Sequence, residues 1–324
     1  MRVNISKLKD LCINPLIGAG LSEEDAQIVF DHLLDEELLG KHSHGFIRMP
    51  SIKRIAASFA SERRILVEDC TEFAVRLITE NTIGLVAAYA ATKKACELAM
   101  DGIGIVSAIG YSGTTGSLGY YGRMIAKQNL IGLIACSSEY AVAPWGGRDA
   151  ILGTNPLAIA IPNGEKPIIT DFSTAAMTYG DLMLAVKEKR EVPYGIVLDS
   201  EGKPSHDPDD ANNGCQLPMA GHKGYALGLA LEILAGVFIG AKAGRDAVQA
   251  SDGIIILAFK PDIFVSKNNF YSSLSSLIHE IKKSNLAYGS DGIRLPGENS
   301  VRIIKERRAE GVCDVPDVVY RELL

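Results

Sequence analysis

The stretch IGIVSAIGYSGTTGSLGYYGRMIAKQNLIGLIACSS, residues 103–138, begins and ends with an apolar run and has a glycine-rich turn and a helix between them. Both runs are typical of buried strands. A strand, a glycine turn and a helix also open a dinucleotide-binding G-x-G-x-x-G unit, but here Gly102 and Gly104 are followed by Ser107 in the third place. Strands and helices do not alternate strictly in the rest of the chain either. We therefore expect a mixed α/β fold rather than a purely doubly wound sheet.

The turn at 110–119 places four glycines between the first strand and the helix. Free backbone N–H groups at a helix start are able to bind a phosphate. The same pattern also fits a simple tight turn, in which glycine only relieves the backbone. The residues alone leave both interpretations open.

Other segments show clear periodicity. Residues 22–40 begin with Ser22 and have Asp25 three positions later, which predicts a helix with a capped N-terminus. A second helix is expected at 81–102, and a strand is expected at 253–265.

The apolar stretch YALGLALEILAGVFIGA at 225–241 is almost long enough to cross a bilayer. Glu232 lies at its centre, where a carboxylate is costly in hydrocarbon. We therefore prefer to interpret it as the buried helix of a globular protein. The spacing of Gly236 and Gly240 indicates close helix packing, as at a subunit interface.

Composition and charge restrict the function. The chain has 324 residues, 47% of them hydrophobic, which is enough for two domains or for one large domain with an appendage. Its net charge of −6 argues against a general nucleic-acid binder, which needs a basic face. We interpret the basic run KERR at 305–308 as a solvated helix face. None of the six cysteines forms a C-x-x-C pair and no secretory signal opens the chain, so we expect reduced thiols and a cytoplasmic location.

The segment KHSHGFIRMP at 41–50 concentrates two histidines and an arginine. His42 and His44 suit a metal, but no further histidine or carboxylate lies at ligand spacing. His44 also suits acid–base chemistry, because histidine titrates near neutral pH. On a helix, Arg48 would share a face with His44, and its planar guanidinium would hold a carboxylate. A purely structural role for the pair is the alternative.

Two more polar clusters combine small residues with hydrogen-bonding groups. PWGGRDAILGTNP at 144–156 lies between strands. GHKGY at 221–225 places Lys223 just before a helix, where a cation meets an anionic ligand next to N-terminal amides. Ordinary structural turns explain both patterns equally well.

Taken together, these stretches resemble the malate/L-lactate dehydrogenase family of the second type. This family also includes sulfolactate, ureidoglycolate and diketogulonate dehydrogenases and an imine reductase that acts on cyclic ketimine acids. Each matching piece alone is modest, but the ordered set is specific. The pieces cover roughly residues 20–300, in the order HSHGFIR, GYYGRMIAKQNLIGLIACSS, APWGGRDAILGTNPLAIAIP, DFST, LPMAGHKGYALGLALEILAG and RLPGE.

The resemblance implies a mixed α/β fold of the L-sulfolactate dehydrogenase-like type, which binds NAD(P) without a Rossmann fold. A large mixed sheet over residues 116–287 would form the cofactor domain. Residues 1–115 together with 288–324 would form a largely helical domain for substrate binding and dimerisation. Family members are usually homodimers with the site near the subunit contact.

The resemblance also implies roles for individual residues. His44 corresponds to the family's proton donor, with Ser43 and Asp181 as its relay partners. Arg48 would hold the substrate carboxylate, and Thr154 would lie near the reacting centre. No metal is implied. The positions that match cofactor contacts are Gly116, Ser138, Asp171, Ser173, Thr174, Ala175, Lys223, Pro296, Gly297 and Glu298.

The implied activity is hydride transfer between NAD or NADP and a small 2-hydroxy or 2-oxo acid such as malate, lactate or sulfolactate. Reduction of a cyclic imine carboxylate, of the piperideine or pyrroline type, is the alternative. A non-catalytic cofactor-binding relative is a more distant one. The expected partners are the small-molecule substrate and a second copy of the chain, with no nucleic acid and no membrane.

The chain departs from the family pattern at three places. Thr114 stands where many members carry a histidine in the glycine turn. The family's DxATS is replaced by DFSTA at 171–175, and Asn299 follows PGE, where a basic or an apolar residue is commoner. These changes concern substrate and cofactor preference. The sequence therefore leaves open the acid or imine, NADH versus NADPH, the stereochemistry and the physiological direction.

Overall fold

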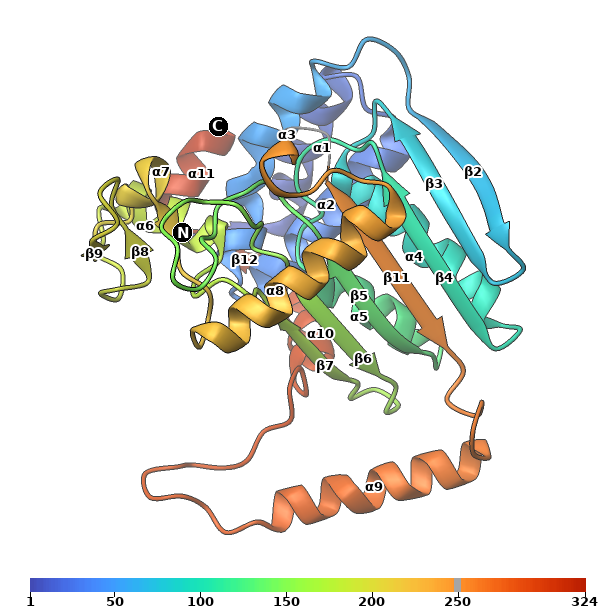
Figure 1. Cartoon of the computed structure of the whole chain (residues 1–324). Coiled ribbons are helices and arrows are strands. Elements are labelled where there is room, and N and C mark those ends of the chain that lie inside the picture. Colours follow the sequence, from blue (N-terminus) through green and yellow to red (C-terminus); the bar gives the residue numbers. More distant parts are fainter. Residues whose placement is uncertain (248–251) are drawn as a thin grey trace.

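The computed structural model describes residues 1–247 and 252–324, and a seven-stranded sheet runs through its centre (Figure 1). The strand order is β2-β3-β4-β11-β5-β6-β7. β3 and β4 pair in parallel, whereas the other neighbouring strands are antiparallel. The expectation of a mixed α/β fold is confirmed. The strands are β2 (Arg64–Thr71), β3 (Ala74–Glu80), β4 (Ile103–Ile109), β11 (Gly253–Phe259), β5 (Ile131–Cys136), β6 (Leu157–Ile161) and β7 (Ile168–Phe172).

Helices cover both faces of the sheet, which explains why its central strands are apolar on both sides. Side chains alternate across a strand, so Ile256 of β11 lies in one hydrophobic core and Ile255 in another. α4 (Gly84–Ala99) and α5 (Leu118–Lys127) pack on the first face. α8 (His222–Ala235) packs on the second face.

A helical unit combines the two ends of the chain around one hydrophobic core. Helices from the first 56 residues supply most of this core, and the last helix completes it. The two ends are also joined by an antiparallel strand pair, β1 with β12. The elements are α1 (Ile5–Gly18), α2 (Glu23–Leu38), α3 (Met49–Ala56), α10 (Ser300–Glu310), α11 (Asp317–Leu323), β1 (Arg2–Asn4) and β12 (Val312–Asp314).

The sheet extends beyond the expected cofactor domain of residues 116–287. β2, β3 and β4 come from residues 64–109, which lie inside the range expected to be largely helical. β3 joins the sheet because its alternate residues Val75 and Leu77 are buried in the same core as α4. The sheet therefore crosses the expected boundary at 115/116, and the helical unit is shorter than the sequence indicates.

The apolar helix α8 is buried on one side only. Leu231 and Ala235 lie in the core with β11, whereas Leu229, Ile233 and Leu234 are 38–47% exposed. By length and composition, residues 222–239 would also pass as a membrane span. Glu232 is buried and accepts hydrogen bonds from backbone and side-chain groups of the same chain. The buried-helix interpretation therefore holds for the inner face of α8.

After β11 the chain leaves the body as an arm. α9 (Lys267–Lys283) stands clear of the sheet in Figure 1, and none of its side chains is buried. A separate small lobe holds α6 (Tyr179–Glu188) beside a three-stranded sheet. The remaining elements of this lobe are β8 (Val197–Leu198), β9 (Pro204–Ser205), α7 (Asp210–Asn213) and β10 (Cys215–Gln216).

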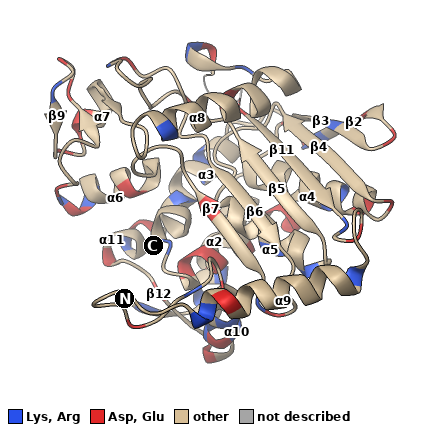
Figure 2. Ribbon diagram, turned by 60° about the horizontal axis from the view of Figure 1, so that its bottom comes forward, with Lys and Arg blue, Asp and Glu red and all other residues tan. Residues whose placement is uncertain are grey.

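Charged residues lie mainly on the outer helices, the loops and the edge strands, whereas the central strands β4, β11, β5 and β6 carry none (Figure 2). The basic run of α10 is less solvated than its sequence suggests. Arg308 pairs with Asp35 and Asp31 of α2 at 2.7 and 3.2 Å, and Arg307 donates to the Leu38 carbonyl. These bonds attach α10 to α2, the helix that precedes the histidine segment.

Candidate active site

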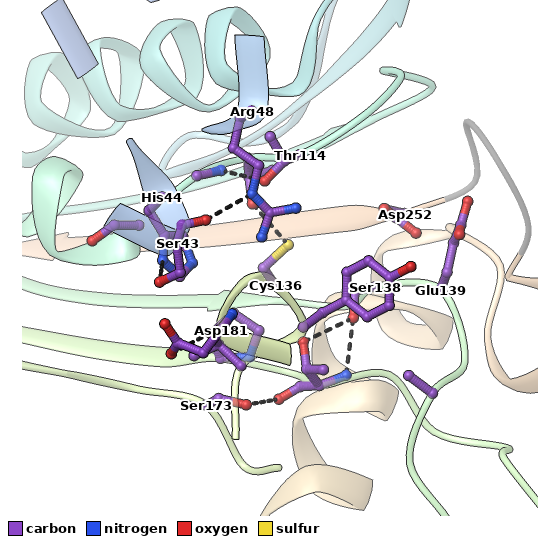
Figure 3. Close-up of a pocket in the computed structure, with 18 of the residues that line it drawn as sticks. Ser43, His44, Arg48, Thr114, Cys136, Ser138, Glu139, Ser173, Asp181 and Asp252 are labelled. Atoms are coloured by element: carbon purple, nitrogen blue, oxygen red, sulfur yellow. Dashed lines mark hydrogen bonds between the residues drawn. The ribbon is translucent and has the colours of Figure 1, made fainter. Parts of the chain in front are cut away.

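A pocket of about 940 Å³ lies between the helical unit, one end of the sheet and the small lobe. Its volume is near the upper end of the range for ligand pockets in proteins, about 300–1,000 Å³. It is therefore large enough for more than one small molecule. Its walls include Ser43, His44, Arg48, Thr114, Gly116, Cys136, Ser138, Thr154, Asp171, Ser173 and Asp181 (Figure 3).

The histidine segment reaches this pocket on two short 3₁₀ turns. The first spans His42–His44 and the second spans Phe46–Arg48, with Gly45 between them. α3 then starts at Met49. The expected helical i, i+4 relationship between His44 and Arg48 is therefore wrong. Both side chains nevertheless line the pocket (Figure 3).

His44 is held in a desolvated position. Its Nδ1 lies 3.1 Å from Ser43 Oγ. Burial, the largest effect, and the nearby Arg48 cation together lower the pKa of His44 to about 4, against the opposing effect of Glu36 and Asp171. The imidazole of the free protein is therefore neutral at neutral pH.

Arg48 is fixed by the loop and lies against the small lobe. Its Nε donates to the Ser43 carbonyl at 2.8 Å. A Cβ atom on Gly180 would overlap both the Arg48 guanidinium and the Ser43 carbonyl, so this approach requires glycine. Burial lowers the Arg48 pKa, whereas Tyr179 and Asp181 raise it. Within the described ranges, Arg48 forms no ion pair, and its guanidinium is available for an anionic ligand.

Asp181 shares the pocket but not the expected relay bond. Its carboxylate accepts from Thr178 Oγ1 at 2.7 Å, and its N–H donates to the same oxygen. This reciprocal pair caps α6. Among the described residues, Asp181 has no hydrogen bond to Ser43 or His44. The structure therefore brings the three side chains together without joining them into a chain.

Thr154 lies at the centre of a group of hydroxyls. Its N–H donates to Ser138 Oγ at 2.9 Å. Its carbonyl accepts from Ser173 Oγ and Thr174 Oγ1 at 2.9 and 3.0 Å. Hydrogen bonds thus join the TNP and DFST segments beside the pocket. Ser138 and Ser173 face the cavity from this cluster.

Two amides at the end of the glycine turn already have hydrogen-bond acceptors in the protein. Gly116 N–H donates to Thr114 Oγ1 at 2.9 Å, and Ser117 N–H donates to His32 Nε2 at 3.0 Å. The Asp171 carboxylate approaches the start of α5 and accepts from Ser117 Oγ at 2.9 Å. A carboxylate at this helix N-terminus favours the tight-turn interpretation over a phosphate site here.

Several predicted cofactor positions lie outside the walls of this pocket. Lys223 is exposed in the first turn of α8. Pro296 lies beside β7, where its carbonyl accepts from Ile169 N–H at 2.9 Å. Glu298 instead pairs with Lys282 at 2.6 Å. The predicted positions that do not line the pocket are Thr174, Ala175, Lys223, Pro296, Gly297 and Glu298.

The pocket also contains charged residues that sequence reasoning missed. Lys41 directly precedes the histidines and pairs with Asp171 at 2.9 Å. Arg54 of α3 lines the same cavity. Asp252 reaches it from the start of β11, and burial beside Glu139 raises the Asp252 pKa to about 7. Lys41 and Arg54 could have been found by their closeness in sequence to the motif, whereas Asp252 had no sequence signal.

The whole chain matches one protein family. The family described as malate/L-lactate dehydrogenase matches residues 3–324. The chain belongs to this family. The malate/(S)-sulfolactate dehydrogenase of Methanothermus fervidus is 36% identical over 322 residues, which cover 96% of this chain and 93% of that protein. The ureidoglycolate dehydrogenase (NAD(+)) of Escherichia coli O157:H7 is 30% identical over 338 residues, covering 100% and 95%.

Solved structures of this dehydrogenase family share the fold over the full chain. Sulfolactate dehydrogenase from Methanocaldococcus jannaschii superposes with a TM-score of 0.87 at 31% identity, covering 100% of this chain and 95% of that one. Δ1-piperideine-2-carboxylate reductase from Pseudomonas syringae pvar. tomato superposes with a TM-score of 0.84 at 27% identity, covering 100% and 98%. The expected L-sulfolactate dehydrogenase-like fold is confirmed.

Proposed function

We propose that the chain is an NAD(P)-dependent oxidoreductase that interconverts a small 2-hydroxy acid and its 2-oxo acid. One observation carries this proposal: His44 and Arg48 line the same pocket, Ser43 is bonded to both, and Arg48 has no ion-pair partner among the residues that the structure describes. Family membership supports it, because the similar proteins are named dehydrogenases of malate, sulfolactate and ureidoglycolate.

Arg48 would bind the substrate carboxylate. A guanidinium forms two parallel hydrogen bonds with a carboxylate, which fixes the orientation of the acid as well as its position. The neighbouring carbon of the acid then lies next to His44. Holding it there makes the subsequent transfer effectively unimolecular.

His44 would exchange a proton with the substrate oxygen. Because Ser43 Oγ faces Nδ1, the nitrogen left for the substrate is Nε2. A neutral His44 accepts the hydroxyl proton during oxidation, and the protonated form donates it during reduction. Asp181 shares the cavity and would complete a relay with Ser43 if a small displacement or a water joined them.

Binding of the acid would also prepare His44 for reduction. The Arg48 charge contributes to the low pKa of His44 in the free protein. A bound carboxylate neutralises this charge, so the His44 pKa rises and the imidazole takes up a proton. Binding of the substrate carboxylate to Arg48 would thus both orient the substrate and favour the protonated His44 that its reduction needs.

The residues around the pocket fit a nicotinamide cofactor. The cavity is large, and Ser138, Ser173 and the Gly116 turn supply polar groups on one side of it. When bound, NAD or NADP supplies or accepts the hydride. Ser138, Asp171, Ser173 and Gly116 would hold it inside the pocket, with Thr154 near the reacting carbon. The remaining predicted positions would contact the cofactor outside the pocket or support the residues that contact it inside. They are Thr174, Ala175, Lys223 and Pro296–Glu298.

A homodimer is part of the proposal. The arm helix α9 presents Phe270, Leu274, Leu277, Ile278 and Ile281 at helical spacing, and none of them is buried. The outer face of α8 and the following Val237 and Phe238 are exposed as well. A second copy of the chain would cover these surfaces, and light scattering after gel filtration would give a mass of two chains.

The domain roles and the cellular location are also proposals. The helical unit would bind the substrate and support the dimer, and the sheet would bind the cofactor. A cytoplasmic location agrees with the cysteines, which are all unbridged in the described part of the chain.

Reduction of a cyclic imine carboxylate is the second candidate. Ser43, His44 and Asp181 lie around one cavity, and a solved structure of similar fold is named a piperideine-2-carboxylate reductase. Rates on 2-oxo acids and on cyclic imine acids, measured with NADH and NADPH, separate the two activities. Cofactor binding by calorimetry without turnover of any of these compounds would contradict both and indicate a non-catalytic relative.

A further inference from the structure

Glu37 lies beneath the loop that carries His44, and the proposed mechanism gives it no part. It belongs to the last turn of α2, and its side chain has no exposed surface. Oε1 lies 2.5 Å from His42 Nδ1. Oε2 accepts the Phe46 N–H at 2.8 Å. One carboxylate thus holds the residue on each side of the Ser43–His44 pair.

The backbone passes close over this carboxylate. A Cβ atom on Gly45 would overlap Glu37 Oε2, so a side chain at position 45 would displace this carboxylate from the loop. The Gly45 N–H donates to the His42 carbonyl at 3.1 Å. A buried carboxylate requires charged or hydrogen-bonding partners. The loop supplies both, and its shape therefore depends on them.

His42 is the ionisable member of this arrangement. The bond to Glu37 raises the His42 pKa, and the charges of Glu188 in α6 and Asp314 in β12 act in the same direction, against the effect of burial. The cation is therefore present below the ordinary histidine pKa. It is lost as the pH rises through the raised value, which leaves a neutral and weaker hydrogen bond.

Glu37, His42 and the Phe46 N–H together form what we call the clamp. We propose that Glu37 is a positioning residue for His44, and that protonated His42 is the partner that keeps the clamp closed. Its catalytic part rests on the proposed function, because it assumes that His44 exchanges a proton with the substrate. A small displacement of such a group is costly, since a misplacement of about 1 Å can reduce a rate by roughly 100-fold.

His42→Asn separates charge from hydrogen bonding. The asparagine amide replaces the Nδ1 donor but does not titrate. Glu37→Gln keeps the acceptor for Phe46 and removes the negative charge. His279→Asn is the matched control, because His279 is exposed on α9, which stands clear of the sheet in Figure 1.

The kinetic test is the pH dependence of kcat in the direction of reduction. In the unaltered enzyme, kcat should fall by about tenfold as His42 loses its proton. In His42→Asn, that limb should disappear, so that kcat stays at the lower level through the His42 transition and falls further only where His44 loses its proton. His279→Asn should behave as the unaltered enzyme. The affinity for reduced cofactor should stay the same in all variants. A limb that remains at the His42 midpoint in His42→Asn would overturn the proposal.

A second readout does not require turnover. In ¹³C-histidine spectra, the His42 signal is the one missing from His42→Asn, and its midpoint gives the pH of the transition. Corrected for its intrinsic pH dependence, exchange of the Phe46 amide should accelerate about tenfold at that midpoint. It should also be faster in Glu37→Gln. Constant exchange across the transition would show that no clamp exists. If the Phe46 amide exchanges as expected but the protein turns over no acid or imine, the proposed function is contradicted and the clamp still stands.

Discussion

Lys41 Nζ lies 2.9 Å from Asp171 Oδ2, which joins the residue before the histidine pair to the end of β7. The two residues are 130 positions apart in sequence. The Asp171 carboxylate also accepts a bond from Ser117 at the start of α5. This one carboxylate therefore ties the helical unit, the glycine turn and the sheet together at the edge of the pocket.

Removal of this ion pair should destabilise the protein. Lys41→Met leaves the largely buried Asp171 with the Ser117 hydroxyl as its one remaining side-chain partner in the described part of the chain, and it also removes the cation 3.6 Å from the buried Glu36. The loss should be about 1–3 kcal/mol in the free energy of unfolding by urea. Arg302→Met breaks the exposed pair with Glu306 and should change it by less than about 0.5 kcal/mol. Equal effects of the two substitutions would show that the Lys41 pair is no more than a surface contact.

Gly180→Ala should impair both folding stability and substrate binding. The added methyl group would overlap the Arg48 guanidinium and the Ser43 carbonyl, so one of them must move, at a cost of about 1–3 kcal/mol. Gly18→Ala meets no atom within 4 Å and serves as the control. Thermal unfolding and the KM for the acid are the measurements. A Gly180→Ala enzyme with unchanged KM would show that Arg48 is not held against α6 as described.

Arg48→Ala should raise the pKa of His44. The Arg48 cation is the second-largest cause of the low His44 pKa, after burial, so its removal favours the protonated imidazole. NMR titration of His44, assigned with His44→Ala, measures this directly. The result expected from the structure is a shift upwards from about 4, whereas Arg302→Ala should cause no shift. An unchanged His44 pKa would show that the charge of Arg48 does not act on His44.

Acid destabilisation should depend on His32. Burial lowers its pKa from 6.5 to about 3, and its Nε2 accepts the Ser117 N–H. Between these two values the unfolded chain binds the proton and the folded chain does not, so the free energy of unfolding falls as the pH drops from about 6.5 towards 3. His32→Gln should make this decline shallower than His279→Gln does, in urea titrations at several pH values. Parallel curves for the two variants would assign the decline to other groups.

Features of the fold that depend on residues close together in sequence, such as a helix cap, could be predicted. Ser22 caps α2 by accepting the Asp25 N–H at 3.1 Å, as the sequence indicates. The strand expected at 253–265 stops at Phe259, because Pro261 cannot continue a ladder. The position of β11 between β4 and β5 depends on contacts across more than a hundred residues, which periodicity does not encode.

The site was predictable to the extent that it lies on one segment. His44, Ser43 and Arg48 are close in sequence and do share the pocket, although on 3₁₀ turns rather than a helix. Lys41–Asp171 and the approach of Asp252 arise only when the sheet forms. The one-sided exposure of α8 was not predictable either, because an apolar helix has the same composition whether it faces a core or a partner.

The most direct test of the account compares the unaltered chain with His44→Ala in the reduction of 2-oxo acids, followed by the absorbance of the reduced nicotinamide. Oxaloacetate, pyruvate and sulfopyruvate are suitable substrates, and cofactor affinity is measured in parallel. The account predicts turnover by the unaltered chain and a kcat about 10²–10⁴-fold lower in His44→Ala, with unchanged affinity for the cofactor. A His44→Ala enzyme that reduces the same acid at the unaltered rate would contradict it.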